Sequence, residues 1–182
     1  ELSWSTYDWA NGKFFFNFND PEMKIIEVAA SGVRAIQNGG NDQKILLGAS
    51  EKIAALTFNP EADPATVLRR LKTDIIDNLT CKESDAYIFL AWGLSMLLME
   101  CSVRRPLMKL SGGENSGKTS AARLLSVLMY GADAVKVASV AANFTDAARN
   151  PFLALDNVEA RNINDELLQF LLLVATGGTR EK

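Results

Sequence analysis

The sequence contains no histidine among its 182 residues. This absence excludes histidine general bases, Ser-His and Cys-His nucleophile pairs, and most zinc sites. Cysteine is also scarce, because Cys81 and Cys101 are the 2 present, and they are too far apart for a metal knuckle or a redox pair. We expect both to be reduced core thiols of a cytoplasmic protein. The net charge is −3, so contact with nucleic acid would depend on local basic patches.

The chain has no long hydrophobic run. The apolar stretch at residues 86–99 is shorter than the ~20 residues that a membrane-spanning helix needs, so we expect no membrane partner. This stretch predicts a buried helix, covered on most sides between an N-terminal head and a nucleotide-binding sheet. The chain begins at Glu1 without an initiator methionine, and we expect it to be a fragment of a longer protein.

The most informative motif is G-x-x-x-x-G-K-T at residues 112–119, the pattern of a P-loop. Gly112 and Gly117 permit a backbone that wraps a phosphate with its N–H groups. Lys118 would place a positive charge on the outer phosphates, and the Thr119 hydroxyl would ligate Mg²⁺. The motif therefore predicts an ATP site with Mg²⁺. Its candidate contacts are Gly112, Gly113, Glu114, Asn115, Ser116, Gly117, Lys118, Thr119 and Ser120.

The flanking residues suit that motif. Residues 106–110 read as a short strand with proline at its first position, and residues 120–130 read as a helix with apolar faces. Strand, glycine-rich loop and helix are the usual surroundings of a P-loop. We therefore predict an α/β fold with a parallel sheet, incomplete in this fragment.

A second motif follows the P-loop in the sequence, and it ends in a carboxylate. The apolar residues 151–155 lead into Asp156, as in a Walker-B strand, so Asp156 would hold Mg²⁺ together with Thr119. Many ATPases place a glutamate directly after this aspartate, whereas Asn157 stands here. Asn157 could orient a water or sense the γ-phosphate, and Glu159 is either the base or a surface residue. The candidate catalytic residues are Lys118, Asp156, Asn157 and Glu159.

The chain divides into three predicted parts: a β-rich head at 1–60, a helical connector at 61–105 and a P-loop core at 106–182. In the head, Trp4, Tyr7 and Trp9 could stack on nucleic-acid bases, but packing in the core or a hairpin is the favoured interpretation. Strands are predicted at 14–18, 25–28, 33–36, 44–47 and 52–58, with a hairpin at Ser31 and Gly32. Helices are predicted at 65–78 and 84–101, and from Asn164 to a stop at Gly177 and Gly178.

Residues 86–182 resemble a family of bacterial ATP-binding proteins from phages and mobile elements, related to primase-associated helicases. The resemblance rests on the SGGENSGKT loop, the Ala-Leu-Asp-Asn run at 154–157 and the leucine-rich helix that ends in ATGG at 175–178. It implies a P-loop NTPase core of the AAA+ or superfamily-three helicase kind. Such proteins are usually ring-forming homo-oligomers that act on single- or double-stranded DNA. The sensor strand and arginine finger of that family are expected outside this fragment, so we expect poor hydrolysis by the fragment alone.

Three functions follow from these motifs. The leading one is a nucleotide-driven DNA-remodelling ATPase of mobile-element replication. The second is a nucleotide-binding switch with little or no hydrolysis, which Asn157 and the acidic net charge favour. The third is a small-molecule or nucleotide kinase, and the sequence argues against it because a Walker-B strand is present without an obvious arginine-rich lid.

Overall fold

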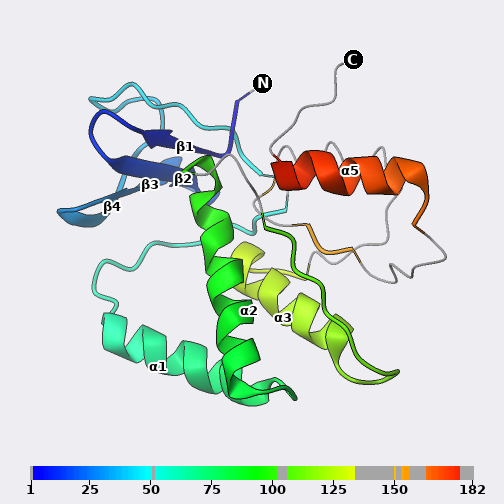
Figure 1. The fold of residues 1–182 in the computed structure, drawn as a ribbon. Helices are drawn as coiled ribbons and strands as arrows, with labels where there is room; N and C mark the ends of the chain where they lie inside the picture. Colours follow the sequence, from blue (N-terminus) through cyan, green and yellow to red (C-terminus); the bar gives the residue numbers. More distant parts are fainter. Residues whose placement is uncertain are drawn as a thin grey trace.

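The computed structural model describes residues 2–50, 52–101, 106–133, 150, 153–155 and 163–176. An N-terminal sheet is followed by helices (Figure 1). Its strands are β1 (Ser5–Asp8), β2 (Lys13–Asn17), β3 (Lys24–Ala29) and β4 (Gly32–Gln37). The α-helices of this part are α1 (Pro64–Asp74), α2 (Glu83–Ser95), α3 (Lys118–Tyr130) and α5 (Asp165–Thr176). Two 3₁₀ helices, η1 (Ile76–Asn78) and η2 (Met96–Cys101), flank α2.

The sheet is antiparallel throughout, with strand order β1-β2-β3-β4. The predicted α/β fold with a parallel sheet is therefore wrong, because the described residues form an α+β arrangement without a parallel sheet. The parallel sheet was predicted for the core at 106–182, where the described segment 106–110 is irregular and pairs with no strand. The observed sheet lies instead in the N-terminal head, where short turns join successive strands and a parallel pair would need a crossover of a dozen or more residues. Ala29 pairs with Gly32, which leaves a two-residue hairpin turn between them. The hairpin predicted at this position is confirmed.

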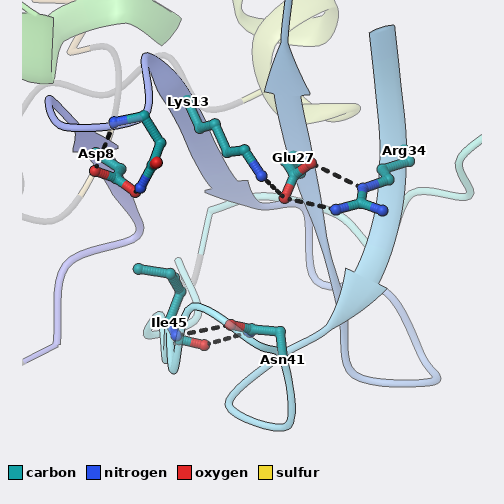
Figure 2. A network of polar contacts seen from close by, with 7 residues as sticks. Asp8, Lys13, Glu27, Arg34, Asn41 and Ile45 are labelled. Atoms are coloured by element: carbon teal, nitrogen blue, oxygen red, sulfur yellow. Dashed lines mark hydrogen bonds and ion pairs between the residues drawn. The ribbon is translucent and has the colours of Figure 1, made fainter. Parts of the chain in front are cut away.

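Three predicted strands do not form. Residues 44–47, 52–58 and 106–110 are irregular. In the first segment, asparagine side chains take the place of a partner strand. Asn41 exchanges two hydrogen bonds of 2.8 and 2.9 Å with the backbone of Ile45 (Figure 2). Asn38 does the same with the backbone of Leu47 at 2.9 and 2.8 Å.

The segment 106–110 keeps the alternation of a strand without pairing as one. Met108 and Leu110 are half-buried against the largest hydrophobic cluster, whereas Leu107 and Lys109 are exposed. Its first residue is fixed to α2, because the indole nitrogen of Trp92 donates a 2.8 Å hydrogen bond to the Pro106 carbonyl. The apolar pattern therefore correctly indicates which side chains of this segment are covered. It does not indicate that the backbone pairs with another strand.

The predicted helix at 65–78 is confirmed in part. Asp63 caps α1 by accepting hydrogen bonds from the N–H groups of Ala65 and Thr66. The helix ends four residues early at Asp74, where the Asn78 side chain donates to the carbonyls of Thr73 and Asp74. None of the α1 residues is buried, and Val67 and Leu68 are exposed. Leu71 packs against the cluster that contains the buried Ile75 and Ile76, just after the helix. Arg69, Arg70 and Lys72 lie on the exposed surface.

The apolar stretch at 86–99 forms most of α2 and part of η2. One face of α2 is buried at Ala86, Phe89, Leu90 and Gly93, a spacing of three and four residues. Tyr87 and Ile88 are exposed, so the helix is covered on fewer sides than predicted, and no parallel sheet of the described part lies beside it. No helix among the described residues is both long enough and apolar enough to span a membrane.

The largest hydrophobic cluster joins the sheet to α2 and α3. Figure 1 shows α2 running from the sheet, at its C-terminal end, to α1 at its N-terminal end. The cluster consists of Trp4, Ile53, Phe89, Met96, Leu125, Met129, Tyr130 and Ala154. Trp4 is thus a core residue, whereas Trp9 is 71% exposed and packs edge-on against Tyr7. Cys81 is exposed, so the prediction of a core thiol is wrong at that position.

Three charged side chains on neighbouring strands of the sheet form ion pairs with one another. Glu27 is 2% exposed, and its carboxylate accepts hydrogen bonds from Arg34 at 2.8 and 3.1 Å and from Lys13 at 3.4 Å (Figure 2). Glu27 and Arg34 stand directly opposite each other on β3 and β4. The Arg34 hydrogen bond is the main cause that holds the pKa of Glu27 below its ordinary value. A buried carboxylate needs such partners, because an unpaired charge in the core is costly.

We expect Arg34→Met to lower the free energy of unfolding at pH 7, since Glu27 then keeps only Lys13 as an ionic partner among the described residues. The pKa of Glu27 is lowered in the folded state, so the contribution of the pair is present above the unfolded pKa and is lost as the pH falls through the folded pKa. The cost of the substitution should therefore shrink in acid. Urea denaturation at pH 7 and pH 3 measures this, with the exposed Arg69→Met as control. An equal cost at both pH values would contradict the assignment.

Candidate functional site

The 112–119 loop leads directly into α3. Residues 112–117 are exposed, and α3 begins at Lys118. Gly117 caps the helix in the left-handed region at φ 82°, where a glycine has no steric penalty. Asn115 is also left-handed at φ 58°, a conformation that asparagine tolerates. The backbone thus makes a tight turn that ends on the N-terminal, partially positive end of a helix of 13 residues.

The Lys118 side chain folds back across this loop. Its ammonium donates hydrogen bonds to the carbonyls of Gly112 at 2.9 Å and Gly113 at 2.6 Å, and to Ser116 Oγ at 3.1 Å. The charge of Lys118 is therefore held inside the curve of the loop and not extended into solvent. A bound anion would meet this ammonium there, and charge-assisted hydrogen bonds to phosphate are stronger than those to neutral carbonyls.

The loop is narrow at its first glycine. A β-carbon on Gly112 would lie 2.7 Å from Ser116 Oγ, whereas a β-carbon on Gly113 would meet nothing within 4 Å. Any side chain at position 112 would therefore displace Ser116 from its place beside the Lys118 ammonium. Glycine at position 112 thus leaves the Ser116 side chain in this place.

α3 is fixed firmly behind the loop. Leu125 is fully buried and Tyr130 is 1% exposed. The Tyr130 carbonyl accepts a 2.7 Å hydrogen bond from the Ala54 N–H, and Gly131 ends the helix in the left-handed region at φ 72°. These contacts hold the helix, and with it the position of the loop, against the sheet and α2. A phosphate site of this kind depends on such a fixed helix end.

The described structure covers only part of the predicted site. Lys118 and Thr119 are half-buried, while Glu114, Asn115 and Ser120 are exposed. The predicted catalytic and metal-binding residues Asp156, Asn157 and Glu159 lie outside the described residues.

The described residues just before Asp156 contact the same hydrophobic cluster as the residues that lead into the loop. Ala154 is buried in the cluster that contains Leu125 of α3, and Met108 and Leu110, which lead into the loop, pack against that cluster. The chain segments that precede the two predicted motifs therefore share one hydrophobic cluster with α3, although they are far apart in sequence.

One residue near the loop, Thr80, could not be predicted from any sequence motif. Thr80, in the connector between η1 and α2, has its hydroxyl 3.9 Å from where a β-carbon on Gly117 would lie. No motif links Thr80 to the loop, because the proximity arises only from the packing of α2 and α3.

Among the described residues, no group of three or more histidine, cysteine, aspartate and glutamate side chains is placed to hold a metal ion.

No protein-family model matches this chain, and comparisons with curated protein sequences and with solved structures give no significant match.

Proposed function

We propose that the 112–119 loop binds the triphosphate of ATP, with Mg²⁺. The single observation that carries this proposal is the Lys118 ammonium held between the carbonyls of Gly112 and Gly113, inside a glycine-rich turn at the N-terminus of α3. A phosphate oxygen can replace those carbonyls as the partner of the ammonium. The helix end adds further attraction of about 0.3–1 kcal/mol for an exposed anionic group.

The donor set fits such a ligand. Lys118 supplies a cation, Ser116 supplies a hydroxyl beside the ammonium, and Gly112 carries no side chain that would displace Ser116 from that place. In this proposal Thr119 and Asp156 hold the Mg²⁺ that neutralises charge on the phosphates. Asn157 and Glu159 stay candidates for orienting or activating water.

For the biological role we propose an ATPase of mobile-element DNA replication, acting as a homo-oligomer in the cytoplasm. The family resemblance of residues 86–182 supports it, whereas the antiparallel sheet gives it no support. Sites can serve similar chemistry on different folds, so the loop is the better guide. The second candidate is a switch that binds nucleotide with little hydrolysis, and Asn157 in place of the usual glutamate favours it.

Calorimetric titration with Mg-ATP, together with phosphate release in the presence and absence of single-stranded DNA, tests these proposals. We expect saturable binding at a single site. Release stimulated by DNA would support the remodelling ATPase, and binding without release would support the switch. Failure of both ATP and inorganic tripolyphosphate to bind would overturn the proposed site.

A further inference from the structure

The connector between η1 and α2, residues 79–82, lies beside the 112–119 loop. Figure 1 shows α2 and α3 with their N-terminal ends at the same side of the molecule. Leu79 anchors the connector, because it packs against both the largest cluster and the smaller cluster around Ile76 and Leu90. Thr80 and Cys81 are exposed next to this anchor. The Thr80 hydroxyl lies 3.9 Å from where a β-carbon on Gly117 would stand.

The position of Thr80 is outside the curve of the loop. Lys118 and Ser116 mark the interior, where the loop carbonyls gather around the ammonium. The β-carbon direction of Gly117, in contrast, points toward Thr80. A group that contacts Thr80 would thus be a part of the ligand that extends beyond the phosphates.

The charges around the connector suit hydroxyl groups better than phosphate. Lys72 is engaged by Asp77 at 2.7 Å and by Glu83 at 3.6 Å. Together with Asp85 in the first turn of α2, these acids outnumber Lys72 and Lys82. Carboxylate and hydroxyl oxygens accept hydrogen bonds from sugar hydroxyls, whereas an acidic surface repels phosphate.

We propose that the 79–82 connector contacts the ribose of the nucleotide and that the Thr80 hydroxyl hydrogen-bonds a ribose hydroxyl. The proposal rests on the proposed function, because it requires the triphosphate to be held by the loop. It makes Thr80 a specificity residue that distinguishes ribonucleotides from deoxyribonucleotides.

The test compares Thr80→Val, which removes the hydroxyl and keeps the shape, with the wild-type chain. We expect Thr80→Val to weaken ATP binding about 3- to 10-fold, the effect of one hydrogen bond, and to leave tripolyphosphate binding unchanged. The wild type should prefer ATP over 2′-deoxy-ATP or 3′-deoxy-ATP by a similar factor, and the variant should lose that preference. Thr73→Val, on the exposed surface of α1, is the matched control.

Alkylation of Cys81 provides an independent readout. Peptide-resolved mass spectrometry separates Cys81 from Cys101, and we expect ATP to slow the reaction at Cys81 severalfold while tripolyphosphate does not. Unchanged ATP affinity in Thr80→Val, or an equal loss for tripolyphosphate, would overturn the ribose contact while leaving the phosphate site intact. Absence of any binding by the wild type would instead overturn the proposed function.

Discussion

Replacing Lys118 with alanine is expected to weaken Mg-ATP binding by about 10- to 150-fold. A hydrogen bond from a charged donor contributes about 1.5–3 kcal/mol to binding. Each ~1.4 kcal/mol corresponds to a tenfold change in affinity, which gives the expected range. The ammonium already lies within 3.1 Å of three oxygens of the loop. Little movement is therefore needed for it to meet a phosphate in the same place. Calorimetric titration of the purified variant measures the loss.

Lys109→Ala is the matched control for this substitution. Lys109 is an exposed lysine in the segment that leads into the loop. The Lys109→Ala substitution removes the same charge as Lys118→Ala but leaves the contacts inside the loop in place. We expect its ATP affinity to stay within a factor of two of the wild type. The stability of Lys118→Ala should change little, since water can satisfy the exposed carbonyls of Gly112 and Gly113. Equal losses of affinity in both variants would show that long-range charge attraction, and not the loop site, binds the nucleotide.

Leu125→Ala is expected to lower the free energy of unfolding by about 3–5 kcal/mol, the range for a leucine deleted from a packed core. Leu125 is fully buried in the cluster that joins α3 to α2 and the sheet. Its neighbourhood is unusually tight, because a β-carbon on Gly93 would lie 2.3 Å from Leu125 Cδ1. Urea denaturation measures the loss. Val127→Ala on the same helix, where the side chain is 48% exposed, should cost no more than about 0.5 kcal/mol.

A double-mutant cycle of Gly93→Ala and Leu125→Ala tests the contact between Gly93 of α2 and Leu125 of α3. Gly93→Ala alone should destabilise the chain by about 1–3 kcal/mol through overpacking, partly offset by the better helix propensity of alanine. In the Leu125→Ala background the added methyl group would enter the space left by the leucine, so the cost of Gly93→Ala should fall or reverse. Additive effects of the two substitutions would contradict the close approach of α2 and α3 at this point.

Features that depend on neighbouring residues were predictable from the sequence. The hairpin between β3 and β4 follows from local turn chemistry. The start of α5 is similar, since the Asn164 side chain accepts a 2.9 Å hydrogen bond from the Leu167 N–H. The P-loop motif likewise identified a turn ending on a helix, and α3 begins at Lys118 within it.

Features that depend on a distant partner were decided only by the tertiary structure. An alternating apolar pattern, as at residues 106–110, shows which side chains are covered but not whether a second strand is present to pair with the backbone. The same limit led to the parallel sheet that the described residues do not form.

The sequence by itself determined which chemical groups stand in the loop at Gly112, Lys118 and Thr119, because glycine freedom, charge and hydroxyl groups belong to the residues themselves. Only the tertiary structure decided that Lys118 turns onto its own loop and that Thr80 lies beside Gly117. The physical reason is that side-chain packing between α2 and α3 sets their relative position. A contact such as Gly93 with Leu125 requires both helices to be placed before it can exist.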